Sequence, residues 1–80
     1  MYNVTFETVH NNHDRLRDDT IIGWCVDLPK VGEQFCMATP PRDAGGCRLL
    51  TTNYVTKVKK EGAIYTFKTS SGSIYRVTRN

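Results

Sequence analysis

The fold is decided by residues 54–77, which read YVTKVKKEGAIYTFKTSSGSIYRV. Polar and apolar residues alternate through this stretch, and turn-forming residues interrupt it at Lys60–Gly62 and at Ser70–Ser73. Such alternation is typical of strands with one buried face, and glycine-containing turns between them are typical of hairpins. The stretch therefore predicts a β-meander, and its lysines and arginines give the meander a basic face.

The length of the chain, 80 residues, is enough for a single domain, which we expect to span residues 1–80. A domain of this size buries roughly 60 to 65% of the surface that its unfolded chain exposes, so it holds one modest core. A deep substrate pocket would remove apolar contacts on which that core depends. The size therefore favours binding at an exposed surface over catalysis.

Residues before the meander continue the same pattern. Alternation predicts strands at residues 2–8, 20–26, 33–38 and 49–59, followed by the meander strands at 63–69 and 73–78. No segment shows a sustained helical period, so the predicted class is all-β. Five or six short strands around so small a core close into a barrel, because closure removes unpaired strand edges. We expect a small five- to six-stranded antiparallel barrel, SH3-like or of a related type.

The expected core is one aromatic cluster on the inward faces of these strands. It consists of Trp24, Phe35, Tyr65, Phe67 and Tyr75. In the second strand, the alternation places Trp24 on the same face as Ile22. In the fourth strand, it places Tyr54 on the inward face together with Val58.

Charge is distributed unevenly along the chain. Residues 1–47 carry four Lys or Arg and seven Asp or Glu, whereas residues 48–80 carry seven bases and a single acid, Glu61. Such asymmetry marks a site for phosphates or for an acidic protein surface, or it lets the two halves of the fold complement each other. Four of the bases are out of phase with the predicted core residues and are expected on one outward face: Lys57, Lys59, Lys68 and Arg76.

The cysteines and the start of the chain bear on its location. Cys25, Cys36 and Cys47 are an odd number of cysteines. The first residues lack the basic and apolar regions of a signal peptide, and no apolar run approaches the roughly 18 residues of a membrane span. We therefore expect a cytoplasmic protein without a membrane partner, in which the cysteines are free thiols.

Several segments of the chain together form a pattern. They are Gly23-Trp24, Asp27 to Met37, Pro40-Pro41, Arg48, Thr51 to Val55, Phe67 to Thr69 and Ser73 to Val77. This combination resembles a group of short proteins encoded by tailed bacteriophages, which share a Leu-Pro-x-x-Gly turn, an aromatic strand, a Thr-Ser-x-Val-like strand and a closing Thr-x-x-Ser-x-Tyr strand. Here Thr52 stands where that pattern has Ser, and Ser71 to Ser73 lengthen the last turn.

The resemblance covers roughly residues 20 to 78. It implies a small β-barrel that is made early in infection and acts on a host component in the host cytoplasm. Inhibition of a host defence is the most concrete version of that role. The resemblance brings no set of catalytic residues with it.

Patterns for metal binding and catalysis are poorly matched. Zinc sites bring their ligands in close sequence pairs, whereas Cys25, Cys36 and Cys47 are spaced eleven residues apart. Cys47 has no general base in its own segment, and Gly45-Gly46 lacks the Lys and the Ser or Thr of a phosphate loop. We therefore expect no metal, no cofactor and no enzymatic activity.

Nucleic-acid binding by the basic face of the last strands is the alternative function. Phosphate contacts need bases on one surface, and single strands also need exposed aromatic rings for stacking. Tyr65, Phe67 and Tyr75 are out of phase with the bases, so they are expected on the core face instead. The acidic first half of the chain would also repel phosphates where it borders the bases.

Binding to a host protein is the function that we expect. A small barrel recognises a partner through an exposed edge strand or through loops with Arg and aromatic anchors. Two polar segments, His10 to Asp19 and Thr39 to Cys47, are longer than simple connections require. The expected role is to inhibit or redirect the bound protein. The candidate binding residues are Arg42, Lys57, Lys59, Lys68 and Arg76.

Overall fold

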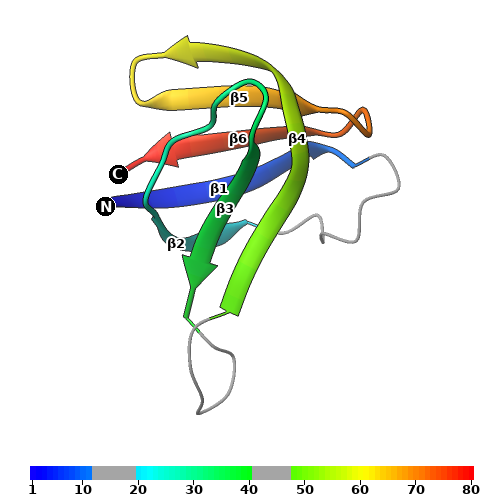
Figure 1. Cartoon of the computed structure of the whole chain (residues 1–80). Helices are drawn as coiled ribbons and strands as arrows, with labels where there is room; N and C mark the ends of the chain where they lie inside the picture. The colour runs from blue at the N-terminus through cyan, green and yellow to red at the C-terminus, as the bar shows by residue number, and fades with distance from the viewer. Residues whose placement is uncertain (12–19, 41–47) are drawn as a thin grey trace.

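The computed structural model describes residues 1–11, 20–40 and 48–80. These residues form six strands: β1 (Tyr2–His10), β2 (Ile21–Cys25), β3 (Gln34–Thr39), β4 (Arg48–Glu61), β5 (Ile64–Thr69) and β6 (Ile74–Arg79). Each strand pairs antiparallel with the next and β6 pairs with β1, so the sheet closes into a barrel (Figure 1). The prediction of an all-β, small antiparallel barrel is confirmed.

The strands of this barrel form two crossing layers. In Figure 1, β5, β6 and β1 lie side by side in one layer, and β3 with the first half of β4 crosses in front of it. β4 is 14 residues long and curves, so that its first half pairs with β3 and its second half with β5. The two ends of the chain lie together, where the Asn80 amide donates to the Asn3 carbonyl at 2.9 Å.

β4 bends because it contains an extra residue against each of its two neighbours. Against β3, the register shifts between Gln34 and Cys36, and against β5 it shifts between Val55 and Lys57. An extra residue of this kind is a β-bulge, which bends a strand and increases its twist. The two bulges allow one continuous strand to belong to both layers.

The bulges also change which side chains of β4 point inward. Thr52, Val55 and Val58 pack toward the interior, whereas the side chain of Tyr54 is 57% exposed. The prediction that Tyr54 shares the inward face with Val58 is wrong, because the bulged segment between them breaks the two-residue alternation.

The first bulge is closed by the buried hydroxyl group of Thr52. The Phe35 amide donates to Thr52 Oγ1 at 3.1 Å, and this hydroxyl donates to the Asn53 carbonyl at 2.8 Å. A buried amide without an acceptor would cost about 1 to 3 kcal/mol. The Thr52 side chain therefore stands in for a backbone acceptor where the ladder between β3 and β4 is irregular.

Four aromatic rings form the centre of the core. Phe6 stacks on Phe35 with ring centroids 6.0 Å apart, and Phe35 contacts Phe67 at 5.5 Å. Phe67 contacts Tyr75 at 5.5 Å, and Tyr75 contacts Phe6 at 5.0 Å. The rings come from β1, β3, β5 and β6, so the cluster joins both layers. The predicted burial of Phe35, Tyr65, Phe67 and Tyr75 is confirmed.

The face of β2 that points inward is not the predicted face but the opposite one. Trp24 is only partly buried and lies outside the core cluster, and the side chain of Ile22 is 65% exposed. Gly23 is buried and alternates with Ile21 and Cys25, which pack into the core, so this face of β2 points inward. A Cβ atom on Gly23 would lie 2.0 Å from the Ala38 carbonyl oxygen. Only glycine allows this close approach of β3, so Gly23 sets the phase of β2. The prediction that Trp24 belongs to the aromatic core is wrong.

The connection between β2 and β3 folds back against the middle of β4. Leu28 packs against the core, and Pro29 is buried. The Gly32 amide donates to the Val55 carbonyl at 2.8 Å, and the Val55 amide donates to the Glu33 carbonyl at 2.9 Å. Gly32 has a φ of 89°, a conformation that favours glycine. These contacts hold the β2–β3 connection beside the bulged segment of β4.

The turn between β5 and β6 is closed by its own polar groups. The Thr69 amide donates to the Ser73 carbonyl at 2.9 Å, and the Gly72 amide donates to the Thr69 carbonyl at 3.0 Å. The hydroxyl oxygens of Thr69 and Ser71 lie 2.8 Å apart. Thr69 and Ser73 are both buried, so these hydrogen bonds satisfy groups that solvent does not reach.

Candidate binding surfaces

β2 and β3 are joined less extensively than the other neighbouring strands of the barrel. Among the described residues they pair at a single position, Trp24 with Ala38, whereas each other neighbouring pair is joined at five or more positions. Beyond Trp24 the two strands separate, because β2 ends at Cys25 and the chain leaves toward Leu28. We call the opening between residues 25–27 and residues 34–37 the β2–β3 seam.

β3 directs backbone groups toward this seam. The Phe35 amide points to β4, because it donates to Thr52 Oγ1. Successive residues in an antiparallel strand direct their amides and carbonyls to opposite sides. The backbone groups of Gln34 and Cys36 therefore point toward β2, beyond the one position at which β2 pairs with β3. Such a strand edge can form main-chain hydrogen bonds with an added strand.

A cleft of about 230 Å³ follows the β2–β3 seam. Its walls come from β2, the β2–β3 connection, β3 and the start of β4. Its apolar lining residues include Trp24, Val26, Leu28, Phe35, Met37 and Leu49, and its charged lining residues are Asp27, Lys30 and Glu33. We call this depression the seam cleft.

Exposed apolar side chains gather around the seam cleft. Met1, Val26 and Leu49 line it, with 85%, 68% and 76% of their surfaces exposed. Trp24 lies opposite Ala38, and Ala38 lies opposite Leu49, so apolar residues follow one another across three strands. Clustered exposed apolar residues are typical of surfaces that contact other proteins.

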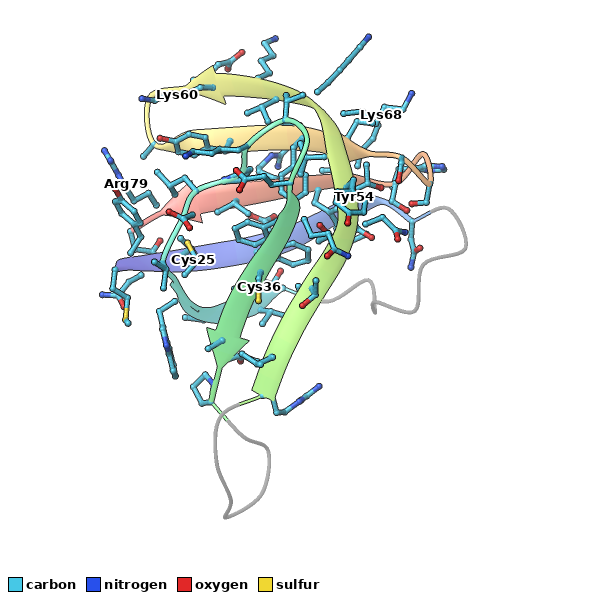
Figure 2. All side chains as sticks on the ribbon, viewed as in Figure 1. Cys25, Cys36, Tyr54, Lys60, Lys68 and Arg79 are labelled. Carbon is cyan, nitrogen blue, oxygen red and sulfur yellow. The ribbon has the colours of Figure 1, made fainter. Side chains whose placement is uncertain are left out.

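Two thiols lie at the seam cleft, on opposite faces of the sheet. Cys25 is buried, whereas Cys36 is exposed on the outside (Figure 2). Burial, with a smaller contribution from Asp27, raises the pKa of the Cys25 thiol. The Thr51 hydroxyl donates to Cys36 Sγ at 3.6 Å. In the described segments, no group of three or more His, Cys, Asp or Glu side chains could hold a metal ion.

Three of the predicted basic residues lie together on the outer face of β4 and β5. Lys57 is directly opposite Lys68, and Lys59 is opposite Thr66. All three lysines line a shallow, open depression, together with Val31, Thr56 and Ile74. We call Lys57 and Lys68 the lysine pair. The predicted outward orientation of these lysines agrees with their positions.

Lys59 and Arg76, the two predicted basic residues of the barrel outside the lysine pair, have acidic neighbours. Lys59 Nζ lies 3.0 Å from Glu61 Oε1, which is the one salt bridge among the described residues. Arg76 on β6 lies opposite Glu7 on β1. No acidic residue of the described segments lines the depression around the lysine pair. The excess positive charge of this face is therefore concentrated on Lys57 and Lys68.

Arg42, the remaining predicted binding residue, lies outside the described residues, as does most of each of the two predicted contact loops, His10 to Asp19 and Thr39 to Cys47. The β2–β3 seam, in contrast, is absent from the predictions made from the sequence. The one signal for it is Gly23, since a glycine inside a strand pattern marks a close approach of another backbone.

Comparisons of the chain with protein-family models, with curated proteins and with solved structures give no match. The similarity to short phage proteins is therefore a prediction from sequence motifs, and the small six-stranded antiparallel barrel is what the structure establishes. Within the described segments, no helix is long and apolar enough to cross a membrane.

Proposed function

We propose that this chain is a non-catalytic binding protein that recognises another protein through the seam cleft. The single observation that supports this proposal most strongly is the β2–β3 seam itself. There, directed backbone groups of β3 lie beside an apolar cleft with Leu49 and Val26 exposed at its border. Main-chain hydrogen bonds and apolar anchors are the two components of strand addition, a common mode of peptide recognition.

The phage-like motifs of the sequence suggest what kind of partner this is. On that basis we propose a host protein as the target, and inhibition or redirection of that protein as the outcome, with an anti-defence role as its most concrete form. A small barrel is suited to such a role, because it needs only to occupy a surface of its target and not to carry out a reaction.

Nucleic-acid binding is the second candidate, and one observation favours it. The side chain of Tyr54 on β4 is 57% exposed. The surface of β4 therefore has an aromatic ring that the sequence pattern assigns to the interior. Tyr54 and Lys68 lie at the same end of the barrel (Figure 2). A base stacked on Tyr54 with a phosphate at the lysine pair would be a minimal single-strand site.

Affinity capture from a bacterial lysate, with and without nuclease, distinguishes the two candidates. Protein binding predicts that a discrete protein is retained after nuclease treatment. It also predicts that the double variant Val26→Gln/Leu49→Gln weakens retention by about tenfold or more, since burial of each side chain is worth about 1.5 to 3 kcal/mol.

The matched control is Val9→Gln, which changes an apolar side chain that is 49% exposed and does not line the seam cleft. Retention by this control should equal that of the parent. Loss of all bound material on nuclease treatment, or equal retention by parent and double variant, would overturn the proposed function.

A further inference from the structure

The lysine pair is an arrangement that costs stability in the isolated protein. Lys57 and Lys68 are directly opposite each other on adjacent strands, and both are exposed. Like charges in this position repel each other. An anion held between the two ammonium groups would remove this repulsion, so the pair offers a favourable position for negative charge.

The surroundings of the lysine pair favour carboxylates of a protein over a chain of phosphates. Val31, which is 62% exposed, and Ile74 border the pair and offer apolar contacts for a side-chain stem. Glu61, on the same face, binds Lys59. A phosphate chain that continued from the pair along β4 toward Lys59 would meet this acid, whereas a protein segment can present one or two carboxylates and then neutral residues.

The β2–β3 connection links the lysine pair to the seam cleft. Lys30 and Glu33 of this connection line the seam cleft, and Val31, between them, lines the depression at the lysine pair. The connection is held to β4 by the hydrogen bonds between Gly32, Glu33 and Val55. A single partner that covers the connection therefore contacts both surfaces.

We propose that Lys57 and Lys68 bind carboxylates of the same partner protein, so that the partner's contact segment combines apolar residues with acidic residues. This inference rests on the proposed function, because it specifies the chemistry of that partner. The complementary charge brings the acidic part to the lysine pair, while the apolar part occupies the seam cleft. Charge complementarity at an exposed site mainly speeds association and selects the partner.

The test uses a blocked octaglutamate peptide as the probe and the full 80-residue chain labelled with ¹⁵N. We expect the peptide, at about 20 mM salt where surface charges are weakly screened, to shift the amide resonances of Thr56, Lys57 and Lys68 in a saturable manner. The double variant Lys57→Ala/Lys68→Ala should bind roughly tenfold more weakly, because both charge contacts are lost.

One control double variant keeps the change in net charge the same. Lys60→Ala/Arg79→Ala removes two bases that lie away from Lys68, at the other end of the strands (Figure 2). This control should bind octaglutamate within about twofold of the parent. Equal weakening by both double variants would show nonspecific attraction to net charge and would overturn the inference.

A second probe, an eight-residue oligothymidylate, tests the phosphate alternative. The inference predicts that it binds no more tightly than octaglutamate, whereas tighter binding that depends on Lys57 and Lys68 would overturn it in favour of nucleic acid. Failure of this inference differs from failure of the proposed function. If octaglutamate ignores the lysine pair while the seam cleft still captures a protein, only the charge assignment is wrong.

Discussion

Phe67 is one of the four rings at the centre of the core. Its ring contacts those of Phe35 and Tyr75 at 5.5 Å each, and its side chain is 1% exposed. We predict that Phe67→Ala lowers the free energy of unfolding by about 3 to 5 kcal/mol, because the change leaves a cavity between the two layers. Such a loss is a large part of the roughly 5 to 15 kcal/mol that holds a domain together.

Urea unfolding, followed by tryptophan fluorescence, measures this loss. Leu49→Ala is the matched control, since Leu49 is 76% exposed and its truncation should change stability by less than about 0.5 kcal/mol. A Phe67→Ala variant that unfolds at the parent's urea concentration would contradict the assignment of the aromatic core.

Cys25 makes stability depend on pH in a defined direction. Its burial raises the pKa of the thiol in the folded protein, whereas the unfolded chain has an ordinary thiol pKa of about 8.5. As the pH rises above that ordinary value, the unfolded chain loses the proton first, so the free energy of unfolding falls. Stability falls over the pH range that begins near the thiol pKa of the unfolded chain and ends at the raised thiol pKa of the folded protein.

Unfolding of the parent and of Cys25→Ala under reducing conditions, from about pH 7 to pH 10, checks this expectation. The difference in stability between the two proteins should shrink as the pH rises, because only the parent has the buried thiol. A difference that stays constant or grows over this range would contradict it.

At the scale of single elements, alternation identifies strands well but loses phase wherever a strand is irregular. β5 and β6 pair with each other without a register shift, so the burial of Tyr65, Phe67 and Tyr75 follows from the sequence. Two elements break the rule for different reasons. β4 contains two bulges, which turn Tyr54 outward, and β2 contains Gly23, whose contact with β3 turns Trp24 outward. Both causes are contacts with a neighbouring strand. Alternation within one strand does not predict such contacts.

Gly23 is predicted to control the contact between β2 and β3. In Gly23→Ala the new methyl group would meet the Ala38 carbonyl oxygen, so the backbones must separate. We expect stability to fall by about 1 to 3 kcal/mol, as for other overpacked sites. The amides of Trp24 and Ala38 should exchange with solvent faster than in the parent. Unchanged stability together with unchanged exchange would contradict the close approach of the two strands.

We predict that replacing one lysine of the lysine pair by an acid raises the stability of the fold and weakens the binding of anions. Lys68→Glu replaces two like charges across β4 and β5 with an opposite pair, so it should raise the free energy of unfolding by about 0.2 to 1 kcal/mol at low salt. The gain should shrink at high salt, where surface charges are screened. The same variant should bind octaglutamate less tightly than the parent.

Lys60→Glu is the control, because Lys60 lies opposite Tyr65 and not opposite another base. Lys60→Glu should not raise the free energy of unfolding, because it removes the contact of Lys60 Nζ with the Tyr65 ring, 5.6 Å from the ring centroid. A lower stability of Lys68→Glu at low salt would mean that the lysine pair supports the fold, and the argument that the pair offers a favourable position for an anion would fail.

At the scale of the whole molecule, the residues that suggest similarity to phage proteins are those that the barrel needs. The Leu28 to Gly32 turn anchors the β2–β3 connection, the Thr52 hydroxyl closes a bulge, and Thr69 with Ser73 closes the last turn. The contacts of Gly32 with Val55 and of Thr52 with Phe35 join distant parts of the chain, whereas the barrel itself is predicted from alternation and from the closure of strand edges. Leu28 and Lys30 of the Leu28 to Gly32 turn also line the seam cleft, so the motifs contribute both to the fold and to the candidate site.

The candidate site, in contrast, arises from how distant strands meet. The lysines were predicted to face outward, because their phase is local to β4 and β5. The β2–β3 seam depends on where two strands separate, which follows from the path of the β2–β3 connection over β4. The lining of the seam cleft comes from β2, the β2–β3 connection, β3, Met1 and the start of β4, so it exists only once these segments are placed around one another. Alternation within one strand does not predict such an opening between strands.

A protein partner that occupies the seam cleft would cover the backbone of β3 beside it. Hydrogen–deuterium exchange of the chain, alone and in complex with the protein that it captures, tests this claim. We predict slower exchange on binding at residues 25–27 and 34–38, where an added strand would pair with β3. Protection confined to the outer faces of β1 and β6, with no change at these residues, would contradict the claim.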